Sequence, residues 1–463
     1  MDLTILFSPI DELIYTVDYP ANSFFKNIRI YWEKMPGYQG AHMALIGVGE
    51  ERGTSSNKGT SLGPDEIRKK LYRLKKGTGA YNIVDLGNLN PGIDLDETYL
   101  RLSEVCRMLL ENNVMPIILG GSHDLDYGQY RGYEDMQKLI SFLNIDAFLD
   151  LEDKKDAEPA KQHIHKMLLH EPNYLFSYTH LAHQTYLIDP FSTAVLEKLN
   201  FEAHRIGQMR TNLAEMEPAI RHADMLSFDI TAIKSSDASG NANAQPFGLT
   251  GEEACQICWY AGLNEKLSSV GFYEYNPTYE DVHKKTASVI ATMIWYFVER
   301  FYHRKHESNF KSNDFLKYVV SMPVEPETLS FYKSKFTEKW WMEVSHPRSG
   351  ARYPRNAIVP CSYTDYQTAT KGMMGSNSKS SVAKLIVFKK DGSGQEGIFS
   401  TGKKKGSDMN SFQYKLAGQE LLFTDKKSGM ITQRFVIDEL TDASLKIHDA
   451  AKDCETKAFV RTK

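Results

Sequence analysis

The sequence predicts an α/β domain built on a parallel sheet of about eight strands, followed by a small antiparallel β-meander. Two observations lead to this prediction. From residue 40 to about 300, short apolar and β-branched runs alternate with longer helical patterns, which is typical of a parallel sheet covered by helices on both faces. Beyond residue 381, short strands follow one another with only turn signals between them, which is typical of a meander.

Eight short runs in the large domain have the length and composition of strands. They cover residues 43–48, 82–86, 116–119, 139–145, 174–178, 204–208, 225–230 and 268–275. Long helical patterns cover residues 94–113 and 281–303. In the tail, seven short strands are expected between "VAKLIVF" and "KAFV", separated by turn signals such as "KDGSG" and "DKKSG".

These patterns divide the chain into four expected segments. Residues 1–310 form the α/β domain, and residues 311–371 form an extension rich in aromatic residues and proline that packs on it. Its Trp340–Trp341 pair is expected to serve packing rather than to stack against a ligand. Residues 372–381 have linker composition, and residues 382–463 form the small meander, loosely similar to part of a lipocalin-like barrel.

Composition narrows the classes of function. A net charge of -4 over 463 residues gives no electrostatic reason to bind nucleic acid or an anionic bilayer. The apolar run 289–298 is about half of the ~20 residues that span a membrane, so no membrane insertion is expected. Five scattered cysteines favour a cytoplasmic location over a disulfide framework. Cys255 and Cys258 form a CxxC, but they are expected on a helix that Thr250 and Glu253 cap, as structural residues.

Potential metal ligands follow three of the expected strands. The strand 116–119 runs into "GGSHD", the strand 139–145 into "DAFLD", and the strand that begins at residue 225 runs after residue 228 into "DIT". Ligands bind beyond the carboxyl ends of parallel strands, so these segments are expected to converge. They supply one imidazole and three carboxylates, a set that suits Mn²⁺ or a similar divalent ion: His123, Asp146, Asp150 and Asp229.

In the order and spacing of these segments, the chain resembles the ureohydrolase family, which includes arginase, agmatinase and formimidoylglutamase. The resemblance covers roughly residues 40–300 and includes "ALIGVGEERG", "GTSLGPDEIR", "GGSHD", "DAFLD", "SFDITAIKSSDA" and "VGFYEYNP". It implies a three-layer α/β/α fold with an eight-stranded parallel sheet. It also implies hydrolysis of guanidino or formimino groups by a hydroxide that bridges two Mn²⁺ ions.

The departures from the family pattern are selective. The pattern GGDHS appears as GGSHD, DAHxD as DAFLD, and SFDIDxxDP as SFDITAIKS. The resemblance therefore implies that the four ligands of one metal are kept. The two ligands that bind only the other metal are replaced by Phe148 and Thr231. Lys234 stands where a further aspartate is expected; its ammonium either offsets part of the carboxylate charge or turns outward. The expected cofactor is one divalent metal, Mn²⁺ by preference, or none.

The resemblance also assigns residues to chemistry. Asp150 and Glu274 are the expected catalytic residues, and Glu274 and Asn276 the expected substrate-binding residues, with Glu274 facing a cationic nitrogen of the substrate. Histidines that follow DAFLD are expected to lie on the surface of a polar helix, since none can be aligned to a family role: His163, His165, His170, His180 and His183.

Two functions stay open at this point. The first is a ureohydrolase-fold protein that has lost the second metal and acts as a binding or scaffolding module, with weak or no catalysis. The second is a hydrolase of a C–N bond in a guanidino or formimino compound that uses a single metal. A protein partner for the C-terminal β domain and assembly into a homo-oligomer are further expectations, and the sequence decides neither.

Overall fold

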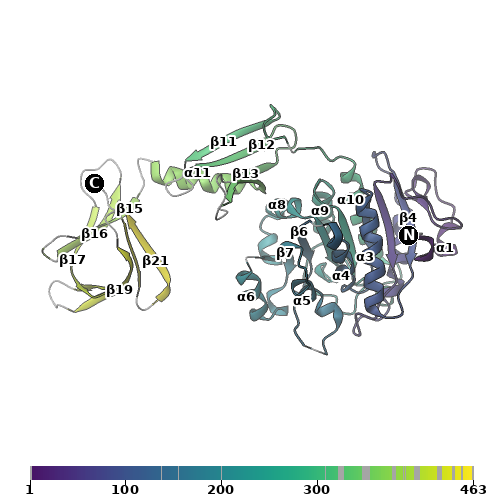
Figure 1. Cartoon of the computed structure of the whole chain (residues 1–463), viewed down its shortest axis with the longest axis horizontal. Coiled ribbons are helices and arrows are strands. Elements are labelled where there is room, and N and C mark those ends of the chain that lie inside the picture. Colours follow the sequence, from purple (N-terminus) through teal and green to yellow (C-terminus); the bar gives the residue numbers. More distant parts are fainter. Residues whose placement is uncertain are drawn as a thin grey trace. The chain divides into compact units, whose positions relative to one another are not determined.

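The computed structural model describes most of the chain (Figure 1). The described residues are 3–136, 138–154, 156–199, 201–307, 309–321, 328–346, 355–377, 382–388, 391, 393–400, 407–424, 430–440, 444–449 and 452–460. They form two compact units, one of Met1–Leu316 with Tyr332–Ser362 and one of Lys317–Phe331 with Tyr363–Lys463.

The first unit contains a ten-stranded sheet. Its strands are β1 (Phe7–Ser8), β2 (Arg29–Ile30), β3 (Met43–Val48), β4 (Ile83–Leu89), β5 (Met115–Leu119), β6 (Ile140–Ile145), β7 (Leu175–His183), β8 (Glu202–Arg205), β9 (Met225–Asp229) and β10 (Ser269–Tyr273). The order is β1-β4-β3-β5-β10-β9-β6-β7-β8, with β2 paired to β4. All pairs are parallel except β1 with β4. The parallel α/β prediction is confirmed, and the short strands β1 and β2 add to it.

In the described residues of this unit, ten α-helices connect or follow the strands. They are α1 (Glu12–Tyr15), α2 (Gly63–Leu71), α3 (Leu95–Glu111), α4 (Leu125–Arg131), α5 (His163–Leu168), α6 (Pro190–Lys198), α7 (Ile206–Met209), α8 (Glu217–His222), α9 (Gly251–Gly262) and α10 (Lys285–Phe301). In the part of the chain that the structure describes, no helix has both the length and the apolar character needed to cross a bilayer.

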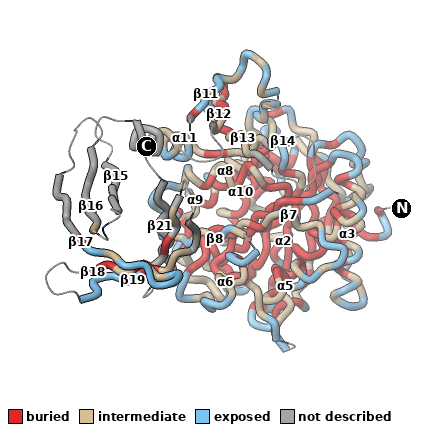
Figure 2. Tube along the Cα trace, turned by 60° about the vertical axis from the view of Figure 1, so that its left-hand side comes forward, coloured by how far each residue is buried: buried red, intermediate tan, exposed pale blue. Residues whose placement is uncertain are grey.

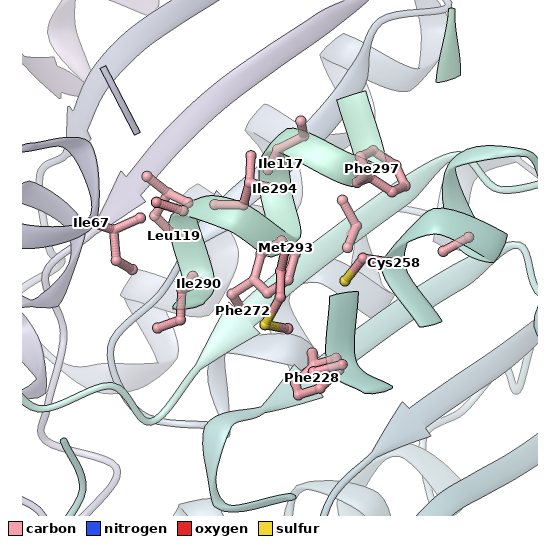
Figure 3. Close-up of a cluster of buried hydrophobic side chains, with 14 of the residues drawn as sticks. Ile67, Ile117, Leu119, Phe228, Cys258, Phe272, Ile290, Met293, Ile294 and Phe297 are labelled. Atoms are coloured by element: carbon pink, nitrogen blue, oxygen red, sulfur yellow. The ribbon is translucent and has the colours of Figure 1, made fainter. Parts of the chain in front are cut away.

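Two hydrophobic cores lie on opposite faces of this sheet. Successive residues of β5 contribute to different cores, since Ile117 and Leu119 belong to one and Ile118 to the other. The first core joins the sheet to α2, α9 and α10, and Figure 3 shows part of it: Ile67, Ile117, Leu119, Phe228, Cys258, Phe272, Ile290, Met293, Ile294 and Phe297. The second joins the sheet to α3, α4 and α5. Helices therefore cover both faces, and buried residues gather at the centre of the unit (Figure 2).

Helix α9 carries the CxxC pair. Its N-cap Thr250 and its residue Glu253 form a reciprocal capping box. Cys258 is buried in the first core and Cys255 packs against that core, and both are free thiols. Burial raises the pKa of Cys255 to about 11, so its thiol is neutral at neutral pH. The pair has the structural role that the sequence predicts.

A second, four-stranded sheet has the order β11-β12-β13-β14, with β11 (Phe315–Ser321), β12 (Thr328–Ser334), β13 (Trp340–His346) and β14 (Arg355–Cys361). Trp340 and Trp341 of β13 are each 7% exposed. The guanidinium of Arg221, on α8, lies 4.3 Å from the centre of the Trp341 ring and donates a hydrogen bond to the Trp340 carbonyl at 2.8 Å. The tryptophan pair thus packs on the α/β domain, as predicted.

The C-terminal sheet has seven strands, each paired with its neighbours in sequence. They are β15 (Val382–Phe388), β16 (Ser393–Ser400), β17 (Ser407–Ala417), β18 (Glu420–Thr424), β19 (Ile431–Leu440), β20 (Ser444–Asp449) and β21 (Lys452–Val460), and all pairs are antiparallel. The predicted meander is confirmed. Helix α11 (Tyr363–Asn377) extends into the expected linker 372–381, of which residues 378–381 lie outside the described residues. The domain boundaries stay a prediction.

Candidate metal centre

Four neighbouring strands of the large sheet carry the candidate site at their carboxyl ends. In the sheet order, β5, β10, β9 and β6 lie side by side and are parallel. His123 follows β5, Asp146 and Asp150 follow β6, Asp229 ends β9, and Glu274 follows β10. Parallel strands bring their carboxyl ends to one edge, so residues that are far apart in sequence meet there.

The loop after β5 brings His123 close to the other ligands. At Gly121 a Cβ atom would overlap the carbonyl oxygen of Glu50, so only glycine fits this crossing. The same carbonyl accepts a hydrogen bond from the Ser122 N–H at 3.0 Å. The "GG" before the histidine therefore serves to bring the loop against residue 50.

The predicted ligands converge on one ring nitrogen. His123 Nδ1 lies 3.2 Å from Asp229 Oδ2, 3.4 Å from Asp146 Oδ2 and 3.6 Å from Asp150 Oδ2. His123, Asp146 and Asp229 are buried, and the Asp150 side chain is 11% exposed. On the opposite side of the ring, Nε2 lies 2.9 Å from Ser227 Oγ, which fixes the ring so that Nδ1 faces the three carboxylates.

Two of these ligand atoms have no hydrogen-bond partner among the described residues. His123 Nδ1 and Asp146 Oδ2 are buried and lack a hydrogen-bond partner there, although buried polar atoms are nearly always satisfied. The donors of His123, Asp146 and Asp229 lie within 4.8 Å of one another. One nitrogen and three carboxylates match a hard to borderline divalent ion, so the residues fit the metal that the sequence predicts.

The crowding of carboxylates also shifts the pKa values of the site. Burial raises the pKa of Asp146, and the charges of Asp229 and Asp150 raise it further, well above its ordinary value. Burial lowers the pKa of His123, but its contacts with the three carboxylates outweigh burial and hold that pKa well above its usual range. Crowded carboxylates thus repel one another and attract a positive charge, which a divalent ion supplies.

Two of the three positions that depart from the family pattern lie beside Asp146. Thr231, in the short 3-10 helix η8 (Ile230–Ala232), donates a hydrogen bond from Oγ1 to Asp146 Oδ1 at 2.9 Å. The Phe148 backbone N–H donates to the same oxygen at 3.0 Å, and its phenyl ring offers no donor atom. Lys234 Nζ lies 3.4 Å from Asp237 Oδ1. This contact favours the interpretation in which the Lys234 side chain turns outward.

Glu274 is buried at the base of the site. Its Oε1 accepts a hydrogen bond from the His123 backbone N–H at 2.9 Å, and its Oε2 accepts one from Asn57 Nδ2 at 2.7 Å. Burial, and then the charge of Asp229, raise its pKa to about 8. Both expected catalytic residues have left-handed backbones, with φ of +47° at Asp150 and +65° at Glu274, and such strain is common at functional sites.

Asn276 does not reach the site. It is buried, and its Nδ2 donates to the Lys58 carbonyl at 2.7 Å and to Asn57 Oδ1 at 3.0 Å. Its Oδ1 accepts a hydrogen bond from the Thr278 N–H at 3.0 Å. Asn276 therefore holds the loop that carries Asn57 and is not among the residues that line the cavity, while the substrate-binding role expected for it stays a prediction.

A cavity of about 580 Å³ opens onto the centre. Six residues of the site line it: His123, Phe148, Asp150, Asp229, Thr231 and Glu274. A larger groove of about 890 Å³ lies along α9 and α10, but none of these residues lines it. The chemistry of the donor set therefore assigns function to the smaller cavity, which has the size of a small-molecule site.

The prediction of surface histidines is wrong for three of the five. His163, His180 and His183 are buried, while His165 and His170 are partly exposed. His163 lies beside the site, with Nε2 3.2 Å from Asp150 Oδ2. It shares the buried face of α5 with Ile164 and Met167. That spacing is present in the sequence and could have placed His163 on the inner side of the helix.

The fold and the cluster define a class of α/β proteins that carry candidate metal ligands at the carboxyl ends of parallel strands. A model of the arginase family matches residues 41–299, more than half of the chain. The chain belongs to the arginase family.

Known relatives agree with this assignment. A formimidoylglutamase of Streptococcus pyogenes serotype M3 is 24% identical, over 63% of this chain and 94% of the relative. One of Streptococcus gordonii is 24% identical, over 56% and 85%. Among solved structures, formiminoglutamase of Trypanosoma cruzi with Mn²⁺ has a TM-score of 0.53 at 20% identity, over 57% of this chain and 95% of that one. Formimidoylglutamase of Bacillus subtilis has 0.55 at 18%, over 61% and 93%. At these identities, the structural likeness establishes the fold.

Proposed function

We propose that this protein binds a single divalent metal, Mn²⁺ by preference, at His123, Asp146, Asp150 and Asp229, and acts as a binding or scaffolding module with weak or no hydrolytic activity. The ligand is a small guanidino or formimino compound that enters the 580 Å³ cavity. The names of the formimidoylglutamase relatives support this class of compound.

The single observation that carries the proposal is the hydrogen bond from Thr231 Oγ1 to Asp146 Oδ1 at 2.9 Å. The hydroxyl proton of Thr231 occupies an oxygen of Asp146 that lies next to Phe148. A second ion would need a donor atom at this place. A phenyl ring cannot coordinate a cation, and a neutral hydroxyl is a poor substitute for a carboxylate. One set of ligands is complete, and the other lacks both of its private members.

The proposed loss follows from what two ions do in such a site. A bound metal activates a water molecule and polarises the substrate, and a pair of ions also holds the water in line with the reacting carbon. In this chain, Glu274 fixes the His123 backbone and carries a carboxyl whose pKa is raised to about 8.

The alternative function is a metal-dependent C–N hydrolase that uses one ion. It is favoured by the retention of Asp150 and Glu274 at the wall of the cavity. Each of these residues has the strained, left-handed backbone that active sites often contain. One metal can still activate water, though less strongly than two.

Three further expectations belong to the proposal. The protein resides in the cytoplasm, which the free cysteines Cys106, Cys255 and Cys258 support. It assembles with a protein partner through the C-terminal β sheet, which is an addition to the region that the arginase family model matches. It forms a homo-oligomer. Analytical ultracentrifugation of the full chain, and of a chain ending at residue 371, tests whether the added segment affects assembly.

Metal content and turnover decide between the two functions. The metal-stripped protein is loaded with Mn²⁺, and the metal per chain is measured by elemental analysis. Release of urea, formamide or ammonia is then followed with arginine, agmatine and formiminoglutamate. We expect one ion per chain and no turnover above the Asp229→Ala variant.

Other outcomes contradict the proposal in different ways. Turnover that Asp229→Ala abolishes establishes the one-metal hydrolase and rules out the inactive module. Two ions in the unmodified protein contradict the assignment of Phe148 and Thr231 as positions of metal loss. No bound ion at all contradicts the metal site itself.

A further inference from the structure

A buried carboxylate–histidine pair lies against the candidate metal centre. His163 Nδ1 is 2.7 Å from Asp126 Oδ1, and His163 Nε2 is 3.2 Å from Asp150 Oδ2. The side chains of His163 and Asp126 are both 0% exposed. The pair comes from helices α5 and α4, so it is held by elements other than the strand ends that carry the four predicted ligands.

The orientation of His163 is that of a metal-ligating imidazole. Such imidazoles usually bind the ion through one ring nitrogen while the other donates to a carboxylate. Here Asp126 accepts from Nδ1, which leaves Nε2 facing Asp150. Asp126 also has a second oxygen, Oδ2, 3.6 Å from His123 Nε2, so one carboxylate lies between both imidazoles.

The distances place His163 in one group with His123 and Asp150, while Asp146 and Asp229 form a second group with the same His123. The ligand atoms of His123, Asp150 and His163 all lie within 4.8 Å of one another, and the centres of the two imidazole rings are 4.2 Å apart. Ligand bonds of about 2.0–2.2 Å keep two donors of one ion within about 4.4 Å of each other. The 4.8 Å limit of the group exceeds this span, so the two imidazoles share one ion only after the side chains move closer together.

We propose that His163 Nε2 is a fifth protein ligand of the single metal, and that Asp126 is the positioning residue that orients it. The site then has two imidazole nitrogens and three carboxylates. When the ion binds, a metal–nitrogen bond replaces the Nε2–H bond of His163, and the proton leaves to solvent. This inference rests on the proposed function, because it requires that one ion binds at His123, Asp146, Asp150 and Asp229.

A second imidazole changes which ions the site prefers. Carboxylates alone suit Mg²⁺, Ca²⁺ and Mn²⁺, whereas imidazole suits Zn²⁺, Fe²⁺ and Co²⁺ as well. The added ligand also stabilises a lone ion without a second one beside it. We therefore expect the site to bind Mn²⁺ more tightly than Mg²⁺.

Counting the coordinated nitrogens tests this directly. The full chain is loaded with one Mn²⁺, and electron–nuclear double resonance on the bound ion, with ¹⁵N-labelled histidine, reports the imidazoles attached to it. We expect two in the unmodified protein and one in His163→Gln. Mn²⁺ affinity, measured by titration calorimetry, should fall about 10- to 100-fold in His163→Gln.

Two further variants separate ligation from packing. Asp126→Asn should keep both imidazoles on the ion but weaken Mn²⁺ binding about tenfold. His165→Gln, on the same helix and partly exposed, should leave nitrogen count and affinity unchanged. The count in the unmodified protein does not depend on the folding of any variant.

The outcomes separate this inference from the proposed function. One bound Mn²⁺ with a single imidazole overturns the role of His163 and leaves the proposed metal site standing. An unchanged nitrogen count in a folded His163→Gln protein has the same meaning. If the unmodified protein binds no Mn²⁺, both the proposed metal site and the fifth ligand are wrong.

Discussion

The Thr231 hydroxyl donates a hydrogen bond to Asp146 Oδ1 across 2.9 Å, between the end of β9 and the end of β6. The other oxygen of Asp146, Oδ2, faces His123 Nδ1 at 3.4 Å. The two oxygens of this carboxylate therefore have different partners: a protein hydroxyl on one side and the candidate metal position on the other.

Restoring metal-binding residues at positions 148 and 231 should create a second metal position. In the double variant Phe148→His with Thr231→Asp, an imidazole and a carboxylate stand beside Asp146, and we expect two Mn²⁺ per chain instead of one. Elemental analysis after dialysis measures this ratio. Phe148→His alone is the control, because a single added ligand should leave the ratio at one. A double variant that still binds one ion contradicts the account of metal loss.

Removing only the hydroxyl should cost stability. Thr231→Val keeps the shape of the side chain but leaves Asp146 Oδ1 with one donor, the Phe148 N–H. We expect the free energy of unfolding to fall by about 1–3 kcal/mol, the usual cost of a hydrogen bond lost at a buried carboxylate. Urea denaturation of the metal-free protein measures it. Thr231→Ser, which restores the hydroxyl, should lose clearly less.

Metal binding should stabilise the fold. At a free Mn²⁺ concentration of 100 times Kd, an ion that binds only the folded state adds about 2.7 kcal/mol. Asp229→Asn removes one of the charged ligands of His123's cluster, so Mn²⁺ should no longer raise the melting temperature of that variant at the same concentration. Thermal unfolding with Mn²⁺ and with a chelator compares the two proteins. An equal shift in both contradicts the role of Asp229.

A buried neutral histidine should make the protein sensitive to acid. Burial, and then the charge of His183, lower the pKa of His180 to about 3 from the usual 6.5 of an unfolded chain. Its ring accepts a hydrogen bond from the Tyr178 hydroxyl at 2.8 Å and donates one to the Asp146 carbonyl at 3.1 Å. Below pH 6.5 the unfolded chain binds a proton at this histidine, whereas the folded chain does not. The contribution of neutral His180 to the free energy of unfolding is therefore complete above pH 6.5 and is lost as the pH falls towards 3.

The size of this effect follows from one proton per chain. Stability should fall by about 1.4 kcal/mol per pH unit through His180 alone. In His180→Gln this part of the slope disappears, while the other titrating groups remain in both proteins and cancel in the comparison. Urea denaturation at pH values between 6 and 4 measures both slopes. Equal slopes contradict a neutral His180 in the folded state.

Arg221 should hold the β13–β14 hairpin to the α/β domain. Its hydrogen bond to the Trp340 carbonyl at 2.8 Å and its position over the Trp341 ring together predict a loss of about 2–4 kcal/mol in Arg221→Ala. The tryptophan fluorescence should also shift to the red as the rings become hydrated. Arg107→Ala removes an arginine that pairs with Glu104 and Glu111 at the surface, so it should cost less than about 1 kcal/mol. Similar losses in both variants contradict the docking role of Arg221.

The convergence of the candidate ligands could be predicted from the sequence, because this convergence depends on local patterns. The apolar runs before His123, Asp146 and Asp229 form strands, and parallel strands bring their carboxyl ends to one edge. Chain order alone does not predict that β10 lies between β5 and β9, and the folded structure was needed to show this order.

The rest of the site depends on side-chain packing between distant segments. His163 faces Asp150 because its other nitrogen is held by Asp126, 37 positions earlier in the chain, and no local pattern reports such a contact. Asn276 follows Glu274 by two positions, yet the turn after β10 directs its amide to Asn57 and Lys58. Residue type predicted the chemistry of the site, whereas the direction of each side chain required the folded structure.

The place of β10 in the sheet has a consequence for how the protein matures. His123 follows β5. Asp146 and Asp150 follow β6, and Asp229 ends β9, which is the neighbour of β6 in the sheet. Residues Ser269–Tyr273 join β5 to this pair of strands, because β10 pairs with β5 on one side and β9 on the other. During translation, which proceeds from the N-terminus at about 5–20 residues per second, the ribosome must release β10 before the two sets of ligands can meet. The proposed metal site can therefore form only after β10 has taken its place between β5 and β9.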